Sequence, residues 1–160
     1  MIDVILIKPH HLVDIIRALG GERIALEPHP YGHNLHGVAE KLLVNRDAVL
    51  QIELGADEIC QPCIHNVNGD CSDIIDTSFR PQAPRSKQEW NLMIDRRWCK
   101  ALSIADGDRI TARQFCERLR QQIDRMTDIY REVPPERVAA RADQLRRGLD
   151  RYLIRSSSEP

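Results

Sequence analysis

The feature that most restricts the fold is a pair of regular apolar patterns in the last third of the sequence. A series of seven apolar residues in 112–133 and a series of five in 138–152 have spacings that alternate between four and three positions. Such spacings place apolar side chains along one face of a helix. Because Pro134-Pro135 interrupts the pattern, we predict two helices that form an antiparallel hairpin over residues 111–155.

Two arrangements would bury the apolar faces of this hairpin. In the first, the hairpin packs on its own domain, as the helices of small bundles do. In the second, the C-terminal helices of two copies meet along a coiled-coil-like seam and form a homodimer. We expect the first arrangement, and the sequence leaves the second open.

The earlier part of the chain predicts a small sheet and further helices. The apolar runs Val4–Ile7 and Val49–Leu54 have the length of buried strands. Two segments with apolar residues at helical spacing lie between them, so we expect the strands to be parallel. A later helix begins after Ser86, which forms a capping-box pattern with Glu89. The expected fold class is therefore α+β, mainly α, with a minimal two-stranded sheet.

The length of 160 residues fits one domain. Aromatic residues make up only 4% of the chain, so aliphatic side chains must fill most of its core. We expect a metal-binding α+β core over residues 1–110, the helical hairpin 111–155 packed on the same domain, and a frayed tail at 156–160.

Three of the five cysteines fall within one short segment, CQPCIHNVNGDC. Cysteine thiolates are soft ligands suited to zinc and to iron–sulfur clusters. Pro62 stiffens the Cys-x-x-Cys turn, and Gly69 allows the chain to reverse and return a third thiol. We therefore predict that Cys60, Cys63 and Cys71 bind one metal centre. The alternatives are unligated thiols and a thioredoxin-like redox pair, a motif that normally opens a helix and has no third cysteine.

A fourth ligand has several candidates. Cys116 lies on an apolar helical face, which favours a role in core packing. Cys99 lies beside the apolar stripe of its predicted helix and is free to face a neighbouring loop. His65 is close in sequence to Cys63, but the turn between them is cramped. We choose Cys99 as the fourth metal ligand.

A pair of histidines, His10 and His11, follows the first predicted strand. Pro9 favours an extended conformation at Lys8, so the helix should begin at or just after the pair. If the two strands are parallel, their C-terminal ends lie side by side, and the cysteine loop follows the second of them. We expect both imidazoles to lie against that loop as cofactor-binding residues, either as ligands or as hydrogen-bond donors to a sulfur.

These motifs resemble a small family of bacterial and archaeal proteins whose members begin with Arg/Lys-Pro-His-His-Leu and carry a Cys-x-x-Cys…Gly-x-Cys loop. The resemblance covers roughly residues 5–120 and rests on the segment Lys8–Leu12 together with Cys60, Cys63, Gly69 and Cys71. It implies a metal or iron–sulfur site and no particular reaction. The present sequence differs from that pattern in HPYGHNLHG and in its long C-terminal hairpin.

The identity of the metal determines the predicted function. A single Cys-x-x-Cys pair with a remote further ligand is more typical of iron–sulfur ligation than of structural zinc, which commonly uses two paired knuckles. We predict an iron–sulfur protein with an electron-transfer or redox-sensing role and a redox or protein partner. The alternative is a structural zinc module. A hydrolytic zinc enzyme would also need an open coordination position and a base, for which the His10/His11 pair and Glu58 are available, and we assign no reaction.

The zinc alternative would use the charge asymmetry of the chain. Residues 1–78 carry five Lys and Arg against twelve Asp and Glu, whereas residues 79–160 carry eighteen against twelve. An Arg-rich half can dock an acidic protein or nucleic acid. The alternative is that the two halves pack together and their fields partly cancel, which the acidic residues interleaved with these arginines favour. We do not expect a nucleic-acid partner.

The start of the chain has no secretory signal, and no apolar run approaches the length of a membrane span. We therefore expect a cytoplasmic protein without a membrane partner, in which the thiols stay reduced.

Overall fold

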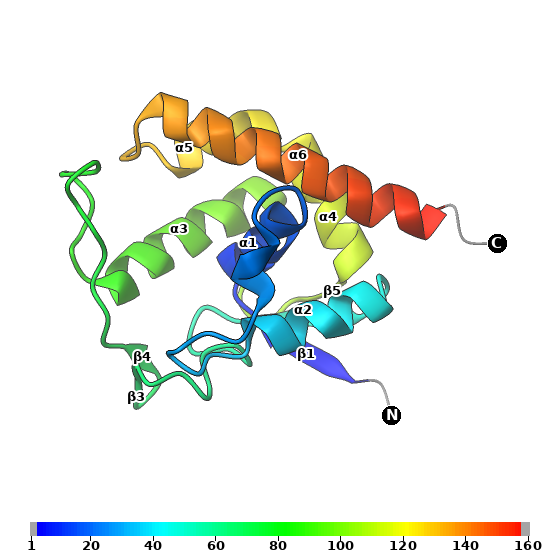
Figure 1. The fold of residues 1–160 in the computed structure, drawn as a ribbon, viewed down its shortest axis with the longest axis horizontal. Helices are drawn as coiled ribbons and strands as arrows, with labels where there is room; N and C mark the ends of the chain where they lie inside the picture. Colours follow the sequence, from blue (N-terminus) through cyan, green and yellow to red (C-terminus); the bar gives the residue numbers. More distant parts are fainter. Residues whose placement is uncertain (1–2, 158–160) are drawn as a thin grey trace.

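The two apolar runs of the N-terminal half form neighbouring parallel strands in the computed structural model of the chain. The structure describes residues 3–157, except for the side chains of residues 24 and 154–157. It confirms the predicted fold class, α+β and mainly α (Figure 1). The elements in order are β1 (Val4–Ile7), α1 (Pro9–Leu19), η1 (Arg23–Leu26), α2 (Leu35–Val44), β2 (Val49–Ile52), β3 (Asn66–Val67), β4 (Asp70–Cys71), α3 (Lys87–Leu102), β5 (Arg109–Thr111), α4 (Ala112–Gln121), η2 (Ile123–Arg125), α5 (Met126–Ile129) and α6 (Pro135–Ser157).

The main sheet has three strands instead of the predicted two. β1 and β2 pair in parallel, with Val4 opposite Val49 and Ile7 opposite Ile52. β5 then pairs with β2 in the antiparallel sense, giving the order β1-β2-β5. β5 has only three residues, too few to give a periodic signal, so the sequence did not predict it.

Helix α1 lies at the centre of the molecule and is crossed by α6 (Figure 1). The crossing depends on two glycines. A Cβ atom on Gly20 would lie 1.9 Å from the backbone oxygen of Gln144, and one on Gly148 would lie 1.8 Å from the backbone oxygen of Ile16. Only glycine allows the two backbones to approach so closely. The contact fixes the C-terminal helix directly on the N-terminal one.

The C-terminal region forms the predicted antiparallel hairpin, with one correction. Ion pairs join Arg120 to Asp150 at 2.8 Å and Asp124 to Arg146 at 3.1 Å, so one arm runs opposite to the other. The first arm is not one helix, because α4 ends at Gln121 and the short helices η2 and α5 continue its path. α6 runs to Ser157 and so includes two residues predicted as frayed tail; residues 158–160 lie outside the described residues.

The apolar faces of the hairpin are buried within the chain. Leu145 and Leu149 on α6 and Leu119 on α4 are fully buried, and they belong to the same hydrophobic cluster as the residues of α1 and the sheet. The seam that a homodimer would have used is therefore covered inside the monomer. Within residues 3–157, no helix is both long and apolar enough to cross a membrane.

Candidate metal centre

The cysteine loop brings three thiols together through two local turns. The backbone N–H of Cys63 donates to the carbonyl of Cys60 at 2.9 Å, which closes the Cys-x-x-Cys turn. β3 and β4 then form a two-residue hairpin whose turn residues, Asn68 and Gly69, have φ angles of 53° and 90°. Such angles are typical of Asn-Gly in this kind of turn. The hairpin returns Cys71 to the side of the loop where Cys60 and Cys63 lie.

The three thiols share a cavity with the histidine pair. Cys60, Cys63 and Cys71 line a cavity of about 230 Å³, and His10 and His11 line it as well. A smaller cavity of about 30 Å³ beneath the loop is lined by the same three cysteines. The loop and the start of α1 therefore form opposite sides of one site, which matches the position expected from the parallel strands.

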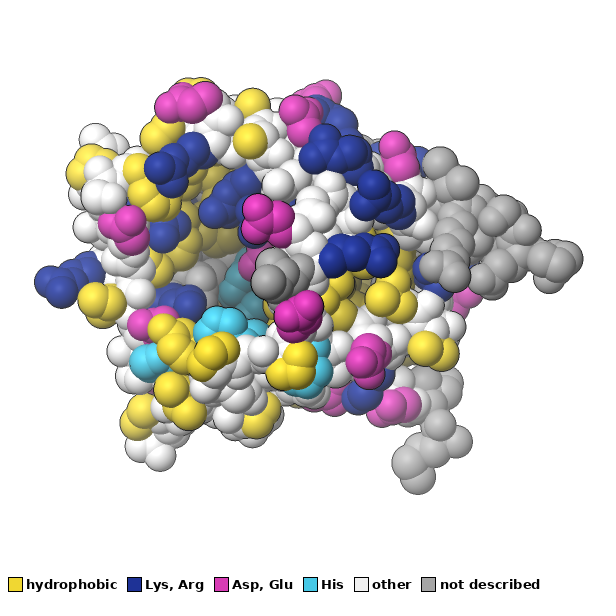
Figure 2. Space-filling view, in the orientation of Figure 1, with side chains coloured by type: hydrophobic (Ala, Val, Ile, Leu, Met, Phe, Trp, Pro, Cys, Tyr) yellow, Lys and Arg dark blue, Asp and Glu magenta, His cyan; other side chains and the backbone are white. Residues whose placement is uncertain are grey.

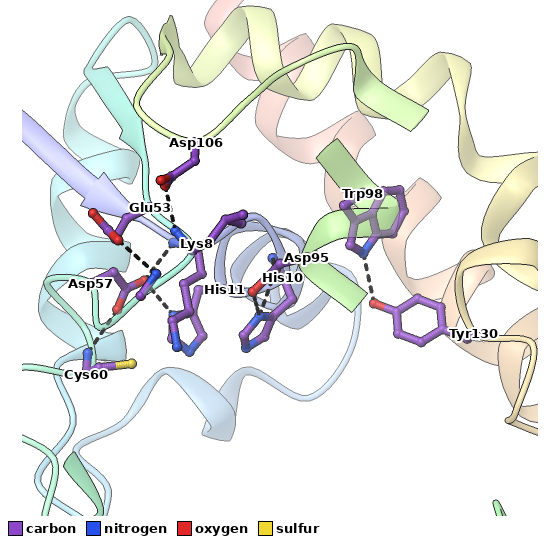
Figure 3. Close-up of polar contacts among 12 residues, drawn as sticks. Lys8, His10, His11, Glu53, Asp57, Cys60, Asp95, Trp98, Asp106 and Tyr130 are labelled. Carbon is purple, nitrogen blue, oxygen red and sulfur yellow. Dashed lines mark hydrogen bonds and ion pairs between the residues drawn. The ribbon is translucent and has the colours of Figure 1, made fainter. Parts of the chain in front are cut away.

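Each histidine of the pair is held by a buried carboxylate (Figure 3). The Nδ1 atom of His11 lies 2.7 Å from Oδ2 of Asp57, and the Nδ1 atom of His10 lies 2.8 Å from Oδ2 of Asp95. Both aspartate side chains are fully buried, and the two imidazole ring centres are 4.3 Å apart. With Nδ1 engaged, Nε2 is the ring nitrogen of each histidine left to bind a metal or a ligand. A carboxylate bound to Nδ1 is the common support of a metal-binding histidine.

Asp57 is the polar centre of the site. Its Oδ2 atom also accepts the backbone N–H of Lys8 at 2.7 Å, and its Oδ1 atom accepts the N–H groups of Ile59 and Cys60, both at 3.0 Å. Burial by itself would raise the pKa of Asp57. The charge and hydrogen bond of His11, together with the backbone N–H donors, outweigh burial and hold this pKa well below its ordinary range. Asp57 therefore remains a carboxylate and joins the start of α1 to the cysteine loop.

Asp95 anchors His10 from helix α3. Its Oδ1 atom accepts the backbone N–H of His10 at 2.7 Å in addition to contacting the imidazole. Burial would lower the pKa of His10, but the charge and hydrogen bond of Asp95 outweigh burial and raise this pKa above its ordinary value. The pair thus favours a cationic imidazole at this edge of the site.

The electrostatics around the thiols are mixed. Burial, followed by the negative charge of Asp57, raises the pKa of the Cys60 thiol to about 11, while the charge of Lys8 acts in the opposite direction. Lys8 is only 3% exposed and lines the cavities beside the thiols. Within the described residues, no carboxylate lies at ion-pair distance from its ammonium group. Lys8 is therefore available to compensate a negatively charged centre built on the thiolates.

A second loop, which the sequence did not connect with the site, covers the remaining side of the cavity. Tyr31 and His33 line it, and the backbone N–H of Ile64 donates to the carbonyl of Tyr31 at 2.8 Å. The ring of Tyr31 also packs edge-on against His65 at 4.5 Å. Burial and the charges of His29 and His11 lower the pKa of His33. This histidine-rich loop lies against the thiols instead of on a remote surface.

The ligand atoms of one group are close enough to bind a single ion. Atoms of His11, Asp57 and Cys60 all lie within 4.8 Å of one another. His65 lines the same cavity as the thiols, and its Nδ1 atom is 3.2 Å from the hydroxyl of Ser72. His11 therefore lies close to Cys60, and His65 lines both cavities that the three thiols border.

The other two cysteines lie away from the loop. All five cysteines are free thiols. Cys116 is fully buried in the core, in agreement with its expected packing role. Cys99, the predicted fourth ligand, is 8% exposed, belongs to the same core and lines neither of the two cavities beside the loop thiols. It lies near Asp95, Asp106 and Asp108, and burial raises its pKa to about 11. The structure therefore does not bring Cys99 to the three loop thiols.

The distance along α3 explains this correction. Lys87 and Asn91 line the cavity, and Asp95 and Cys99 follow them at successive steps of four residues. Cys99 is 8% exposed and part of the core, whereas the sequence favoured a side chain that faces a neighbouring loop. Eight residues separate it from Asn91, and at 1.5 Å per residue this places its backbone about 12 Å farther along the axis.

Sequence reasoning did not identify Asp57 and Asp95 as residues of the site. The sequence does indicate that Asp95 is buried, because it lies next to Ile94 in the most apolar stripe of its helix. A carboxylate is buried only with a partner. For Asp57 the sequence gives a weaker indication, which is its position three residues before Cys60. Neither signal indicates which histidine the carboxylate holds.

Comparison with known proteins gives one match. No curated protein and no solved structure is significantly similar to the chain. One family of proteins, described as "Protein of unknown function (DUF1284)", matches residues 29–132, which include the cysteine loop and Cys99 but not His10 or His11. Because this match covers about two thirds of the sequence, the chain belongs to the DUF1284 family.

Proposed function

We propose that this protein binds an iron–sulfur cluster and has an electron-transfer or redox-sensing role. Cys60, Cys63 and Cys71 supply three ligands, and Nε2 of His11 supplies the fourth in place of the originally predicted Cys99. The observation that carries the proposal is the convergence of the three thiols and His11 on one cavity, with the His11 ring fixed by buried Asp57. Thiolate ligation supplemented by histidine is known for such clusters.

The size of the cavity favours a cluster over a single zinc ion. Structural zinc sites are closed, with ligand atoms about 2.0–2.3 Å from the metal, and leave no further space among the ligands. The cavity bordered by the three thiols measures about 230 Å³. At about 30 Å³ for one water molecule in the liquid, this exceeds the volume of one ion several times. A group of several atoms fits that space better.

The charge of the surroundings supports the same proposal. A cluster held by three thiolates is anionic, and Lys8, a buried cationic residue, lines both cavities next to those thiols. A cluster in this position would accept or donate single electrons. Hydrogen bonds and nearby cations such as Lys8 and His10 would set its reduction potential. That potential would determine whether the cluster accepts electrons from a redox protein partner or donates electrons to it.

One observation favours zinc as the second candidate. Ligand atoms of His11, Asp57 and Cys60 lie within 4.8 Å of one another, a separation that one ion can bridge. Against this, the carboxylate of Asp57 already accepts four hydrogen bonds. The docking surface of the zinc alternative is also partly engaged within the chain, since Arg97 forms a double hydrogen bond with Glu132.

The test is metal analysis of protein prepared without oxygen. We expect a brown protein that absorbs near ~400 nm and contains iron and acid-labile sulfide in stoichiometric amounts. A colourless protein with one zinc ion per chain would instead establish the zinc candidate. A protein that binds neither metal would contradict both.

Single substitutions test the ligand set. Cys60→Ser, Cys63→Ser, Cys71→Ser and His11→Ala should each lower metal content, because ligand binding is coupled to folding. Cys99→Ser should leave it unchanged. Cys116→Ala is the matched control, since it removes a buried thiol away from the site and should cost only packing energy, about 1 kcal/mol. Loss of metal in Cys99→Ser, with retention in His11→Ala, would return the fourth position to Cys99.

A further inference from the structure

A second cavity, separate from the thiols, lies between α1, α3, α6 and the segment 74–80. Its volume is about 320 Å³, within the usual range of small-molecule sites. Four cationic side chains line it, against two carboxylates, those of Asp14 and Asp76. The cations are Arg17, Arg80, Lys87 and Arg141. Figure 2 shows a hollow of this kind, with histidine side chains inside it and Lys and Arg side chains near its edge.

Two of these four cations, Arg80 and Arg141, have no carboxylate partner among the described residues. Arg17 lies 3.8 Å from Asp14, and Lys87 lies 3.3 Å from Asp73. Among residues 3–157, by contrast, no carboxylate oxygen lies within 4 Å of the guanidinium nitrogens of Arg80 or Arg141. Their positive charge is therefore not neutralised by an ion pair within the protein.

Aromatic rings and one backbone carbonyl hold these guanidinium groups in place. Arg80 donates from Nε to the carbonyl oxygen of Asp76 at 2.8 Å and lies 4.9 Å from the ring centre of Trp90. Arg141 lies 5.4 Å from the ring centre of Tyr130. Stacking of this kind fixes the plane of a guanidinium while leaving its N–H donors available.

The arginines are also close enough to repel one another. Burial and the positive charges of Arg141 and Arg137 lower the pKa of Arg80, and only the charge of Asp76 opposes them. A folded protein gains nothing from holding like charges together in a partly buried position. An anion placed between them would relieve this repulsion and accept bidentate hydrogen bonds.

The cavity adjoins the candidate metal centre. His10, Asp14, Lys87 and Asn91 line both cavities. Within the described chain, the side-chain amide of Asn91 forms no hydrogen bond, so its donor and acceptor are free for a ligand. A ligand bound by the arginines would therefore lie next to the Asp95-bound imidazole of His10.

We propose that this basic cavity binds a small molecule carrying an oxyanion, either a phosphate or a carboxylate, through Arg80 and Arg141. The inference goes beyond the proposed metal function and does not depend on which metal the thiols bind. The two sources share one chemistry, a planar or tetrahedral group of anionic oxygens that matches the guanidinium fork.

Isothermal titration of the purified full chain tests the proposal, with inorganic phosphate and succinate as probes. The titrations are run at low ionic strength, with metal content recorded and with chloride at equal ionic strength as the blank. We expect at least one probe to bind, and binding to weaken as salt is added. Binding of phosphate alone, succinate alone or both supports the proposal and identifies the source of the oxyanion.

Substitutions then assign the site. Arg80→Gln and Arg141→Gln should each weaken binding at least about tenfold, the usual effect of losing a hydrogen bond to a charged group. Arg146→Gln is the matched control, because Arg146 is on the same helix as Arg141 and pairs with Asp124 on the surface. It should bind the probe like the wild type.

Two results would overturn the proposal. One is the absence of saturable binding of both probes. The other is equal binding by the Arg141→Gln and Arg146→Gln variants. If Arg80→Gln lowers the melting temperature too far for titration, Arg141→Gln decides the matter, because Arg141 lies 5.4 Å from the ring centre of Tyr130 and so stacks less closely than Arg80, which lies 4.9 Å from that of Trp90.

Discussion

Replacing Asp57 with Asn tests the polar centre that joins α1 to the cysteine loop. The carboxylate accepts four hydrogen bonds and is fully buried. Asparagine has nearly the same shape and retains one oxygen, which can still accept from Ile59 and Cys60. Its amide group then faces the N–H of Lys8 and Nδ1 of His11, two positions where the carboxylate had been an acceptor. The substitution therefore removes two acceptors without opening a cavity.

The expected loss follows from those two contacts. The buried N–H of Lys8 is left without an acceptor, which costs about 1–3 kcal/mol of unfolding free energy. This is a large fraction of the stability of a typical domain, which is about 5–15 kcal/mol. His11 can move its proton to Nε2 and accept from the new amide at Nδ1, which leaves Nε2 protonated and unable to bind a metal. The metal should also bind more weakly, by about 10–100-fold, because His11 loses the carboxylate that orients its ring.

Urea unfolding of the metal-free protein measures the first effect, and competition with a chelator measures the second. Asp150→Asn serves as the matched control, because Asp150 is 62% exposed and pairs with Arg120 on the surface. It should change stability by less than about 1 kcal/mol. A loss in Asp57→Asn no larger than in Asp150→Asn would refute the reasoning.

Three further predictions concern pH and packing. Because the folded pKa of Asp57 is depressed, its contribution to stability is present above the unfolded pKa of about 4 and is lost as pH falls below that value. In urea unfolding between pH 3 and 6, the unfolding free energy of the Asp57→Asn variant should therefore fall less with decreasing pH than that of the wild type. Because the pKa of the Cys60 thiol is raised to about 11, metal binding must displace its proton. The apparent affinity for the metal should therefore rise by up to about tenfold per pH unit from pH 7 to 9. A metal affinity independent of pH would exclude this thiol as a ligand. Gly148→Ala should destabilise the chain by about 1–3 kcal/mol although alanine favours helices, since its Cβ would lie 1.8 Å from the backbone oxygen of Ile16; an unchanged melting temperature would contradict the close crossing.

The sequence predicted the elements whose residues repeat over several turns or alternate in a buried run. β1, β2 and the arms of the hairpin belong to this class. It could not predict β5, whose three residues become a strand only because β2 offers a free edge. The break after Gln121 is also a tertiary effect, since the apolar spacing continues through it without a change. Short elements of this kind are decided by their neighbours and not by local pattern.

The candidate site was predictable in its soft ligands and not in its carboxylates. A Cys-x-x-Cys pair with a third cysteine indicates metal chemistry by residue type alone. Asp57 and Asp95 belong to a residue type that is abundant and mostly exposed, so only burial singles them out. Cys99 shows the converse error: its residue type suits a metal site, but its side chain is buried in the core, and sequence does not give the distance along α3 to a loop.

The two aspartates connect the site to separate parts of the fold. His11 is held by the loop that carries the thiols, whereas His10 is held by α3, which packs against the C-terminal region through the hydrogen bond of Trp98 to Tyr130 at 3.2 Å. Adjacent residues on one helix thus depend on two segments far apart in sequence. The imidazoles can adopt this arrangement only when both segments are docked on α1. Residues of α1 and α3 line both the thiol cavity and the basic one, and the ring centre of His10 lies 4.3 Å from that of His11. His10 therefore lies where the two cavities meet.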